Sequence, residues 1–301
     1  MIKPACFFLF LFFFQAVFIT ALSAQIRYSV NPDNPRPGEP VTIGVYGEVS
    51  HAVLTIGERQ FSRTAFFPVP GFMAAVLTVP SAANSGAAVI KLENNQSVIY
   101  EIPITIADRT FRSEVIDLNP TLTGIRTDPS PQRVEEANLL WAILRTTGDT
   151  VYHTGSFVPP VTSTRRTSFF GNRRVFRYSD GRSDTSIHAG VDYGVPTGTR
   201  VIASGAGRVV LARSRIVTGN SIIIEHAPGI YSLYYHLDKI EVEEGSIVNT
   251  GALLGLSGAT GLATGPHLHW EIRVNTENTD PDAFLNRPIL DKELIMSKIS
   301  N

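Results

Sequence analysis

The sequence predicts an all-β protein in which two β domains are joined by a helical connector. Residues 25–108 consist of short apolar runs that end at Pro, Gly, Asn or Ser, which is typical of strands in antiparallel sheets. Residues 161–290 carry a second, glycine-rich series of such runs, and the clear helical period lies between the two, within residues 109–160. A chain of 301 residues is also long enough for two domains.

Residues 1–24 have the pattern of a secretory signal. Lys3 precedes an apolar run that ends in small residues before Gln25, and this order is typical of a signal peptide that is removed. The alternative is an uncleaved anchor, for which the run is short against the ~20 residues that span a bilayer. Only that alternative implies contact with a membrane. We therefore expect an exported protein of the periplasm or the cell envelope.

Composition limits the possible partners. The formal net charge is -1, so no strong field favours a polyanion. Five arginines lie between residues 165 and 177. Because no stacking aromatics are interleaved with them, we expect them to hydrogen-bond to turns or to attract a carboxylate of a peptide substrate, and not to bind nucleic acid. The single cysteine, Cys6, lies in the expected signal, so a cleaved chain binds any metal through nitrogen and oxygen. The oligomeric state is left open.

The N-terminal module, residues 25–108, resembles immunoglobulin-like β-sandwiches in its general pattern only. It shows no cluster of histidines or acids, and its lone His51 is expected at the surface. Residues 291–301 are expected as a C-terminal tail.

Residues 109–160 form the expected connector with one helix. Pro131 suits the first helical turn and Gly148 suits the stop. Five apolar residues recur near helical spacing and predict the face that packs on a neighbouring domain: Val134, Ala137, Leu140, Trp141 and Leu144.

Residues with catalytic chemistry gather in residues 161–290, within three short motifs. S-I-H-A-G-V-D-Y-G contains His188 and Asp192, L-Y-Y-H-L contains His236, and G-P-H-L-H-W-E-I contains His267 and His269. A further histidine of this region, at position 226, follows an apolar run and is expected in a turn or at the surface.

Alternate side chains of a strand share a face, so His267, His269 and Glu271 are expected on the same side. Two histidines and a carboxylate, with one position left for water, are the ligand set of a catalytic zinc site. Each motif alone is a weak signal, because H-x-H is frequent on ordinary strands. Spacing alone would make both His267 and His269 ligands.

Together, the three motifs resemble the lysostaphin-type (LytM, M23) zinc metallopeptidases. The similarity runs with intact spacing from S-F-F-G-N-R-R at residues 168–174 to T-D-P at residues 279–281. It covers about the last two-fifths of the chain and leaves out the N-terminal module. It implies a predominantly antiparallel β domain with Zn²⁺ as its cofactor.

The resemblance also implies the role of each residue. His188, Asp192 and His269 match the metal ligands, and His236 and His267 match two active-site histidines that do not bind the metal. His267 would be the base toward the metal-bound water, and His236 would stabilise charge on the tetrahedral intermediate. Glu271 is the rival base, although we expect it instead to hydrogen-bond to a metal ligand on the side away from the metal or to take part in strand pairing.

The implied function is an exported zinc metalloendopeptidase that hydrolyses peptide cross-links of peptidoglycan. The alternative is a non-catalytic or autoinhibited regulator that activates another cell-wall hydrolase, since some relatives have lost ligands. All five motif positions carry the required residue type here. The sequence does not determine which cross-link is cut.

Overall fold

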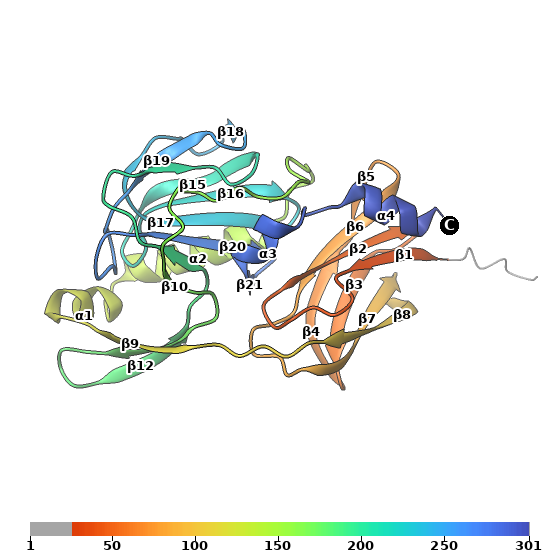
Figure 1. The fold of residues 1–301 in the computed structure, drawn as a ribbon, viewed down its shortest axis with the longest axis horizontal. Coiled ribbons are helices and arrows are strands. Elements are labelled where there is room, and N and C mark those ends of the chain that lie inside the picture. The colour runs from red at the N-terminus through yellow and green to blue at the C-terminus, as the bar shows by residue number, and fades with distance from the viewer. Residues whose placement is uncertain (1–25, 301) are drawn as a thin grey trace, which may run out of the picture.

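The computed structural model describes residues 26–300, which form two packed β domains (Figure 1). The expected signal at residues 1–24 lies outside the described residues. No helix within residues 26–300 is both long and apolar enough to cross a membrane. The prediction of a mostly β fold with antiparallel sheets is confirmed.

The N-terminal domain consists of two four-stranded sheets. One sheet has the order β1 (Arg27–Asn31), β2 (Pro40–Tyr46), β6 (Phe72–Thr78), β5 (Phe67–Val69), and the other β4 (Arg59–Ala65), β3 (His51–Ile56), β7 (Gly86–Asn94), β8 (Ser97–Ile106). Residues from both sheets, among them Ile43 of β2 and Ile90 of β7, share one apolar core. An immunoglobulin-like topology stays a prediction.

The region expected as a connector contains more structure than the one helix. It holds β9 (Ser113–Asp117), α1 (Pro120–Arg126) and α2 (Pro131–Arg145). Strand β9 pairs in parallel with β11 (Arg173–Arg177), which pairs on its other side with β12 (Ser183–Ile187). Strand β9 has only five residues, S-E-V-I-D, so its sequence shows too little alternation of apolar and polar residues to predict a strand. Residues 113–126 thus pack directly beside the C-terminal β domain.

Helix α2 begins at Pro131 as expected, with Ser130 as its N-cap. The predicted packing face is wrong in part, because Val134, Ala137 and Trp141 are exposed. The face that packs carries Leu140, Ile143 and the buried Leu144, which contact the core around Leu211 and Tyr231.

A polar contact accompanies the apolar packing of α2. Glu136 lies on the packed side, and its Oε2 accepts a hydrogen bond from the backbone N–H of Ile216 at 2.8 Å. The helical spacing of apolar residues does not predict such a hydrogen bond.

The C-terminal domain is built on a ten-stranded sheet. Seven of its strands follow the order β10 (Arg166–Ser168), β13 (Val191–Tyr193), β20 (Leu268–Val274), β17 (Ile230–Ile240), β16 (Gly219–Ala227), β15 (Gly207–Arg215), β18 (Ile247–Val248). The other three are β14 (Arg200–Ile202), β19 (Leu253–Ser257) and β21 (Glu277–Thr279). The side chains of Ile222, Tyr234 and Trp270 are fully buried in its core.

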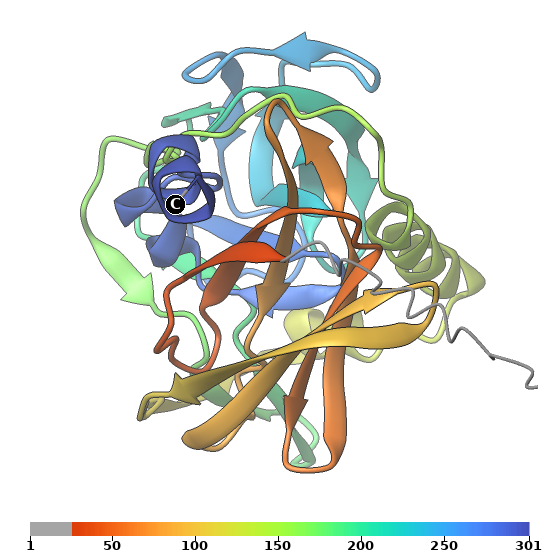
Figure 2. The same cartoon turned by 90° about the vertical axis from the view of Figure 1, so that its right-hand side faces the viewer.

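Two short helices, α3 (Pro281–Asn286) and α4 (Lys292–Ile299), follow the sheet. The expected C-terminal tail therefore contains α4, which returns to the N-terminal domain and lies beside β1 and β2 (Figure 2). Ile295 and Ile299 of α4 are buried, and Arg27 Nη1 donates to the carbonyl of Ile299 at 3.3 Å. The boundaries 25–108 and 161–290 stay predictions.

Candidate active site

Strand pairing brings two of the expected metal ligands together. Asp192 of β13 lies directly opposite His269 of β20 in the antiparallel register. Their neighbours Val191, Tyr193 and Trp270 are buried in the apolar core on the other face. Because strand side chains alternate, the polar pair is left on the same open face of the sheet.

Gly190, in the H-A-G-V-D motif, allows β13 to approach β20. A Cβ at this position would lie 2.2 Å from the carbonyl oxygen of Trp270. Any larger residue would therefore push the two strands apart, so the glycine is required by close backbone approach.

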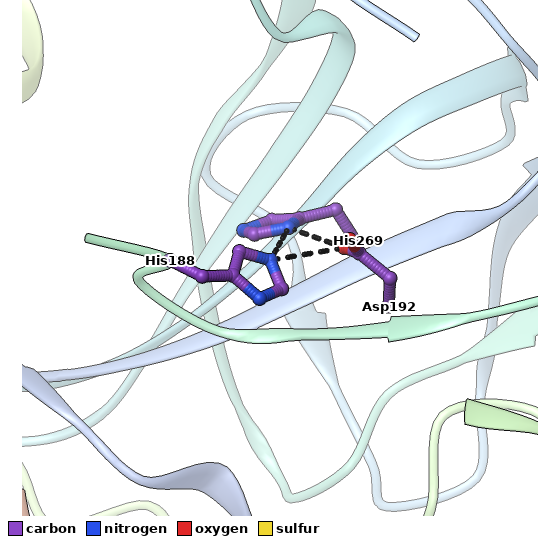
Figure 3. Close-up of side chains that lie close together, drawn as sticks. All are labelled: His188, Asp192 and His269. Atoms are coloured by element: carbon purple, nitrogen blue, oxygen red, sulfur yellow. Dashed lines mark hydrogen bonds and ion pairs between the residues drawn. The ribbon is translucent and has the colours of Figure 1, made fainter. Parts of the chain in front are cut away.

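The third expected ligand, His188, lies in the segment between β12 and β13 and points toward the other two (Figure 3). Its Nε2 is 3.2 Å from Asp192 Oδ1 and 3.0 Å from His269 Nδ1. Asp192 Oδ1 is in turn 2.7 Å from His269 Nδ1. Two imidazole nitrogens and one carboxylate oxygen thus converge on one point, and all three residues are buried.

Hydrogen bonds to the far nitrogens set the tautomers of the two rings. His188 Nδ1 lies 2.9 Å from the carbonyl oxygen of Phe169, so the N–H is there and Nε2 keeps its lone pair. His269 Nε2 lies 2.9 Å from Glu271 Oε1, so in the neutral form of the ring the N–H is there and Nδ1 keeps its lone pair. With both rings neutral, the two free lone pairs face Asp192, as metal ligation requires.

Glu271 lies on the side of His269 away from Asp192. Its second oxygen accepts a hydrogen bond from Arg273 Nε at 2.9 Å, so both oxygens are occupied. Burial alone would raise the pKa of Glu271, but Arg273 and His269 outweigh it and hold the pKa well below its ordinary value. These contacts suit a carboxylate that orients His269, in agreement with the expected support of a metal ligand and against a role as base.

The three converging residues form a strongly coupled electrostatic group. Burial opposes the charge on Asp192, but His188 and His269 outweigh it and hold the pKa of Asp192 well below its ordinary value. Burial would also lower the pKa of His269, but Asp192 and Glu271 raise it to about 9. For His188, burial dominates and lowers the pKa. The site is therefore built around a carboxylate that stays ionised.

The two remaining expected residues lie at the same cavity. His236 is near the end of β17 and His267 directly precedes β20, and their ring centroids are 4.8 Å apart. His236 Nδ1 is 2.8 Å from the carbonyl oxygen of Thr260, and His267 Nδ1 is 2.8 Å from that of Gly265. Each neutral ring therefore keeps its free lone pair on Nε2, and His267 Nε2 is 3.9 Å from Asp192 Oδ1.

His236 has an unusual backbone conformation. Its φ is 61°, in the left-handed region, and its N–H donates to the carbonyl of Thr218 at 2.9 Å. Such a conformation costs on the order of 1–3 kcal/mol in a residue other than glycine, and strained residues of this kind cluster at functional sites. Burial, followed by the nearby rings of His267 and His269, lowers the pKa of His236 to about 3.

Comparison with known proteins identifies the domain that carries this geometry. Residues 186–281 match peptidase family M23. These residues form an M23 peptidase domain. The resemblance expected from the motifs is thereby confirmed.

The relatives of the M23 domain share it within longer chains. Peptidoglycan DD-endopeptidase ShyB of Vibrio cholerae is 42% identical over 93 residues, which are 31% of this chain and 22% of ShyB. DD-carboxypeptidase/endopeptidase Mpg of Neisseria meningitidis is 36% identical over 135 residues, 44% of this chain and 30% of Mpg. The chain thus matches less than a third of each of these two relatives.

A solved structure resembles both domains together. The crystal structure of a putative peptidase M23 from Pseudomonas aeruginosa has a TM-score of 0.60 and 24% sequence identity, and the match covers 83% of this chain and 94% of that one. At this identity the likeness shows a shared fold. The N-terminal domain of this chain is therefore included in the common architecture.

The donor set of the M23 domain fits a zinc ion. Zinc is bound at about 2.0–2.2 Å by imidazole and carboxylate in tetrahedral sites, which places ligand atoms about 3.3 Å apart. The observed separations of 2.7 to 3.2 Å between the three atoms need only a small outward movement. Nitrogen and oxygen donors without thiolate also suit this metal.

The cavity at the site has a volume of about 220 Å³ and extends beyond the M23 domain. All five expected residues line it, together with Glu271. One wall comes from the segment before the M23 domain, which contributes Ile116, Leu118 and Arg126. Sequence reasoning missed this contribution, because nothing in residues 109–160 resembles an active-site motif.

The arginines near the site are engaged within the protein. Arg174 contacts Asp192 and Glu114, Arg166 pairs with Asp282, and Arg177 pairs with Asp117. The expectation that they hold turns or attract a substrate carboxylate did not include ion pairs inside the fold. A carboxylate distant in the sequence leaves no local signal.

The prediction for His226 as a turn or surface residue is wrong. The side chain is fully buried in β16, with Nδ1 2.8 Å from the carbonyl of Ala206 and Nε2 2.7 Å from Ser232 Oγ. Burial lowers its pKa to about 3. It is a structural histidine of the sheet and does not line the active-site cavity.

Proposed function

We propose that this protein is an exported zinc metalloendopeptidase that hydrolyses peptide cross-links of peptidoglycan. The observation that carries the proposal is the convergence of His188, Asp192 and His269 at a cavity that His236 and His267 also line. The substrate class is suggested by the M23 relatives named as peptidoglycan DD-endopeptidases. Export is supported by the signal pattern of residues 1–24.

Within this proposal, His188 Nε2, Asp192 Oδ1 and His269 Nδ1 would hold the metal. When bound, Zn²⁺ supplies a Lewis acid for the scissile carbonyl and lowers the pKa of a coordinated water to about 7. Glu271 fixes the tautomer of His269, and the Phe169 carbonyl fixes that of His188. The protein thereby presents a ligand set whose rings are already oriented, and His269 has to lose its second proton before it can bind the metal.

His236 and His267 would move and stabilise charge at the reacting amide. Each ring is anchored through Nδ1 to a backbone carbonyl, so Nε2 is the atom that exchanges a proton with the reacting groups. An oxyanion contact requires His236 to be protonated at Nε2, and negative charge developing on the substrate oxygen would raise its pKa from the value of about 3 in the metal-free chain. We assign the base to His267 and the oxyanion contact to His236 from the family resemblance. Removal of one such oxyanion donor costs on the order of 10²–10³ in rate.

Mass spectrometry of muropeptides incubated with the zinc-loaded chain tests the proposal. We expect products in which a peptide cross-link is hydrolysed, and none with His269→Ala. The masses also identify the bond that is cut. A chain that binds zinc, leaves every cross-link intact and stimulates a separate wall hydrolase would be a regulator and would refute the proposal.

A further inference from the structure

We propose that Glu114, in strand β9 outside the M23 domain, is a positioning residue that fixes the metal ligands Asp192 and His188 through Arg174 and Ser168. The proposal rests on the proposed function for the identity of the metal. It implies that the M23 domain depends on the segment before it for tight metal binding. The contacts of Glu114 carry this inference.

Strand pairing places Glu114 beside the site. In the parallel ladder between β9 and β11, Glu114 is in register with Arg174. Ile116 and Leu118, two and four residues further on, line the active-site cavity. Val115, which points to the opposite face, is 56% exposed. The face of β9 that carries Glu114 therefore forms part of the wall of the site.

Both carboxylate oxygens of Glu114 are used within the protein. Oε1 accepts from Arg174 Nε at 2.5 Å and from Ser168 Oγ at 2.8 Å. Oε2 accepts from Asn172 Nδ2 at 3.0 Å. The three donors come from the segment 168–174, and no sequence pattern predicts that this segment contacts β9. Glu114 thus joins β9 to this segment by charge-assisted hydrogen bonds.

Two of these three donors, Arg174 and Ser168, contact the proposed metal ligands directly. Arg174 Nη2 donates to Asp192 Oδ2 at 2.7 Å, which leaves Asp192 Oδ1 to face His188 and His269. Ser168 Oγ lies 3.1 Å from His188 Nδ1. Glu114 therefore reaches two of the three ligands through one intervening side chain each.

Charge balance explains why a carboxylate is needed at this position. Arg174 is a permanent cation with only 15% of its side chain exposed, next to a site for a divalent cation. Glu114 neutralises it and holds the guanidinium so that Nη2 meets Asp192. Without Glu114, the guanidinium loses its Nε partner and competes with the metal for Asp192. Outer-shell changes of this kind typically weaken metal affinity by about 10- to 100-fold.

The chain offers a matched control on the same two strands. Asp117 of β9 is in register with Arg177 of β11 and pairs with it, as Glu114 does with Arg174. The Asp117–Arg177 pair is exposed and contacts no ligand. Loss of this pair tests the cost of weakening the β9–β11 ladder without disturbing the metal site.

The test is zinc affinity of the full chain, measured by competition with a chromophoric chelator, for Glu114→Ala, Glu114→Gln and Asp117→Asn. We expect Glu114→Ala to weaken affinity by about 10- to 100-fold and Glu114→Gln to weaken it less. The zinc affinity of Asp117→Asn should stay within about twofold of that of the parent, because the exposed Asp117–Arg177 pair contributes little. Thermal unfolding checks that each variant is folded. If Glu114→Ala does not fold, Glu114→Gln, which conserves the shape of the side chain, provides the test.

Unchanged zinc affinity in a folded Glu114 variant, or an equal loss in Asp117→Asn, would overturn the proposal. A parent chain that binds zinc but cleaves no muropeptide, with affinity still lost in Glu114→Ala, supports positioning by Glu114 while it refutes the proposed function. The effect of Glu114→Gln should also be smaller in an Arg174→Gln background, because the two residues act through one contact.

Discussion

Asp192 and His269 face each other across the β13–β20 pair, with Asp192 Oδ1 2.7 Å from His269 Nδ1. His267, two residues before His269, keeps its Nε2 3.9 Å from the same oxygen. The two histidines of the H-x-H motif therefore stand at different distances from the common carboxylate. The family resemblance is the basis for expecting different tasks of them, and this difference in distance is compatible with it.

Alanine substitutions should separate those tasks. We expect His269→Ala to lose both zinc and activity, because it removes one of the three proposed protein ligands. His267→Ala should keep about one zinc per chain and lose activity by at least about 100-fold, since it removes a proton acceptor. Metal content by mass spectrometry and muropeptide cleavage measure the two effects. Zinc loss in His267→Ala together with zinc retention in His269→Ala would reverse the assignment.

Glutamine substitutions should distinguish the base from the oxyanion contact. Glutamine donates a hydrogen bond but takes up no proton at neutral pH. His236→Gln is therefore expected to retain more activity than His236→Ala, by about 10-fold or more. His267→Gln should be as inactive as His267→Ala. Initial rates of the four zinc-loaded variants decide the matter, and the opposite pattern would exchange the roles of the two rings.

A methyl group at position 190 should separate β13 from β20. In Gly190→Ala the new Cβ meets the carbonyl oxygen of Trp270 at 2.2 Å, so backbone must move. We expect a loss of about 1–3 kcal/mol in the free energy of unfolding, as for overpacked cores, together with weaker zinc binding. Denaturant unfolding and chelator competition measure both quantities.

Gly124→Ala is the matched control for that substitution. Gly124 lies in helix α1 and a Cβ there meets no atom within 4 Å. Because alanine favours a helix over glycine by up to about 1 kcal/mol, this variant should be as stable as the parent or more so. Equal stability of Gly190→Ala and the parent would show that the strands tolerate a wider separation.

The five candidate site residues could be named from the sequence because they lie in three short motifs whose spacing matches the M23 family, and the structure brings all five to one cavity. Alternation along a strand is enough to place His267, His269 and Glu271 on one face. The role of Glu271 was harder to predict, since it depends on Arg273 and on the tautomer of His269. Spacing indicates which side chains share a face and leaves their hydrogen bonds undetermined.

The contribution of residues 113–126 was not predictable in the same way. Glu114 reaches Arg174 across 60 residues of sequence, and an ion pair of that separation has no local pattern. Trp141 follows the helical period, yet α2 packs through Leu140, Ile143 and Leu144 and leaves Trp141 exposed. In both cases the contact depends on residues far away in the sequence, which a local pattern does not contain.

His226 should make the stability of the chain fall in acid. Its pKa is about 3 in the folded protein and about 6.5 when unfolded, so the unfolded chain takes up the proton first. The contribution of neutral His226 to the free energy of unfolding is complete above about pH 6.5. It is lost as the pH falls toward about 3, by up to about 1.4 kcal/mol per pH unit. The neighbouring ring of His153, 6.3 Å away, adds to this loss when protonated.

Unfolding of the metal-free parent and of His226→Gln between about pH 7 and pH 4 isolates that effect. At neutral pH we expect the variant to be less stable, because it loses the contacts to Ala206 and Ser232. The difference should shrink as the pH falls, since only the parent has a buried imidazole to protonate at position 226. A difference that is independent of pH would mean that the pKa of His226 is the same in the folded and the unfolded chain.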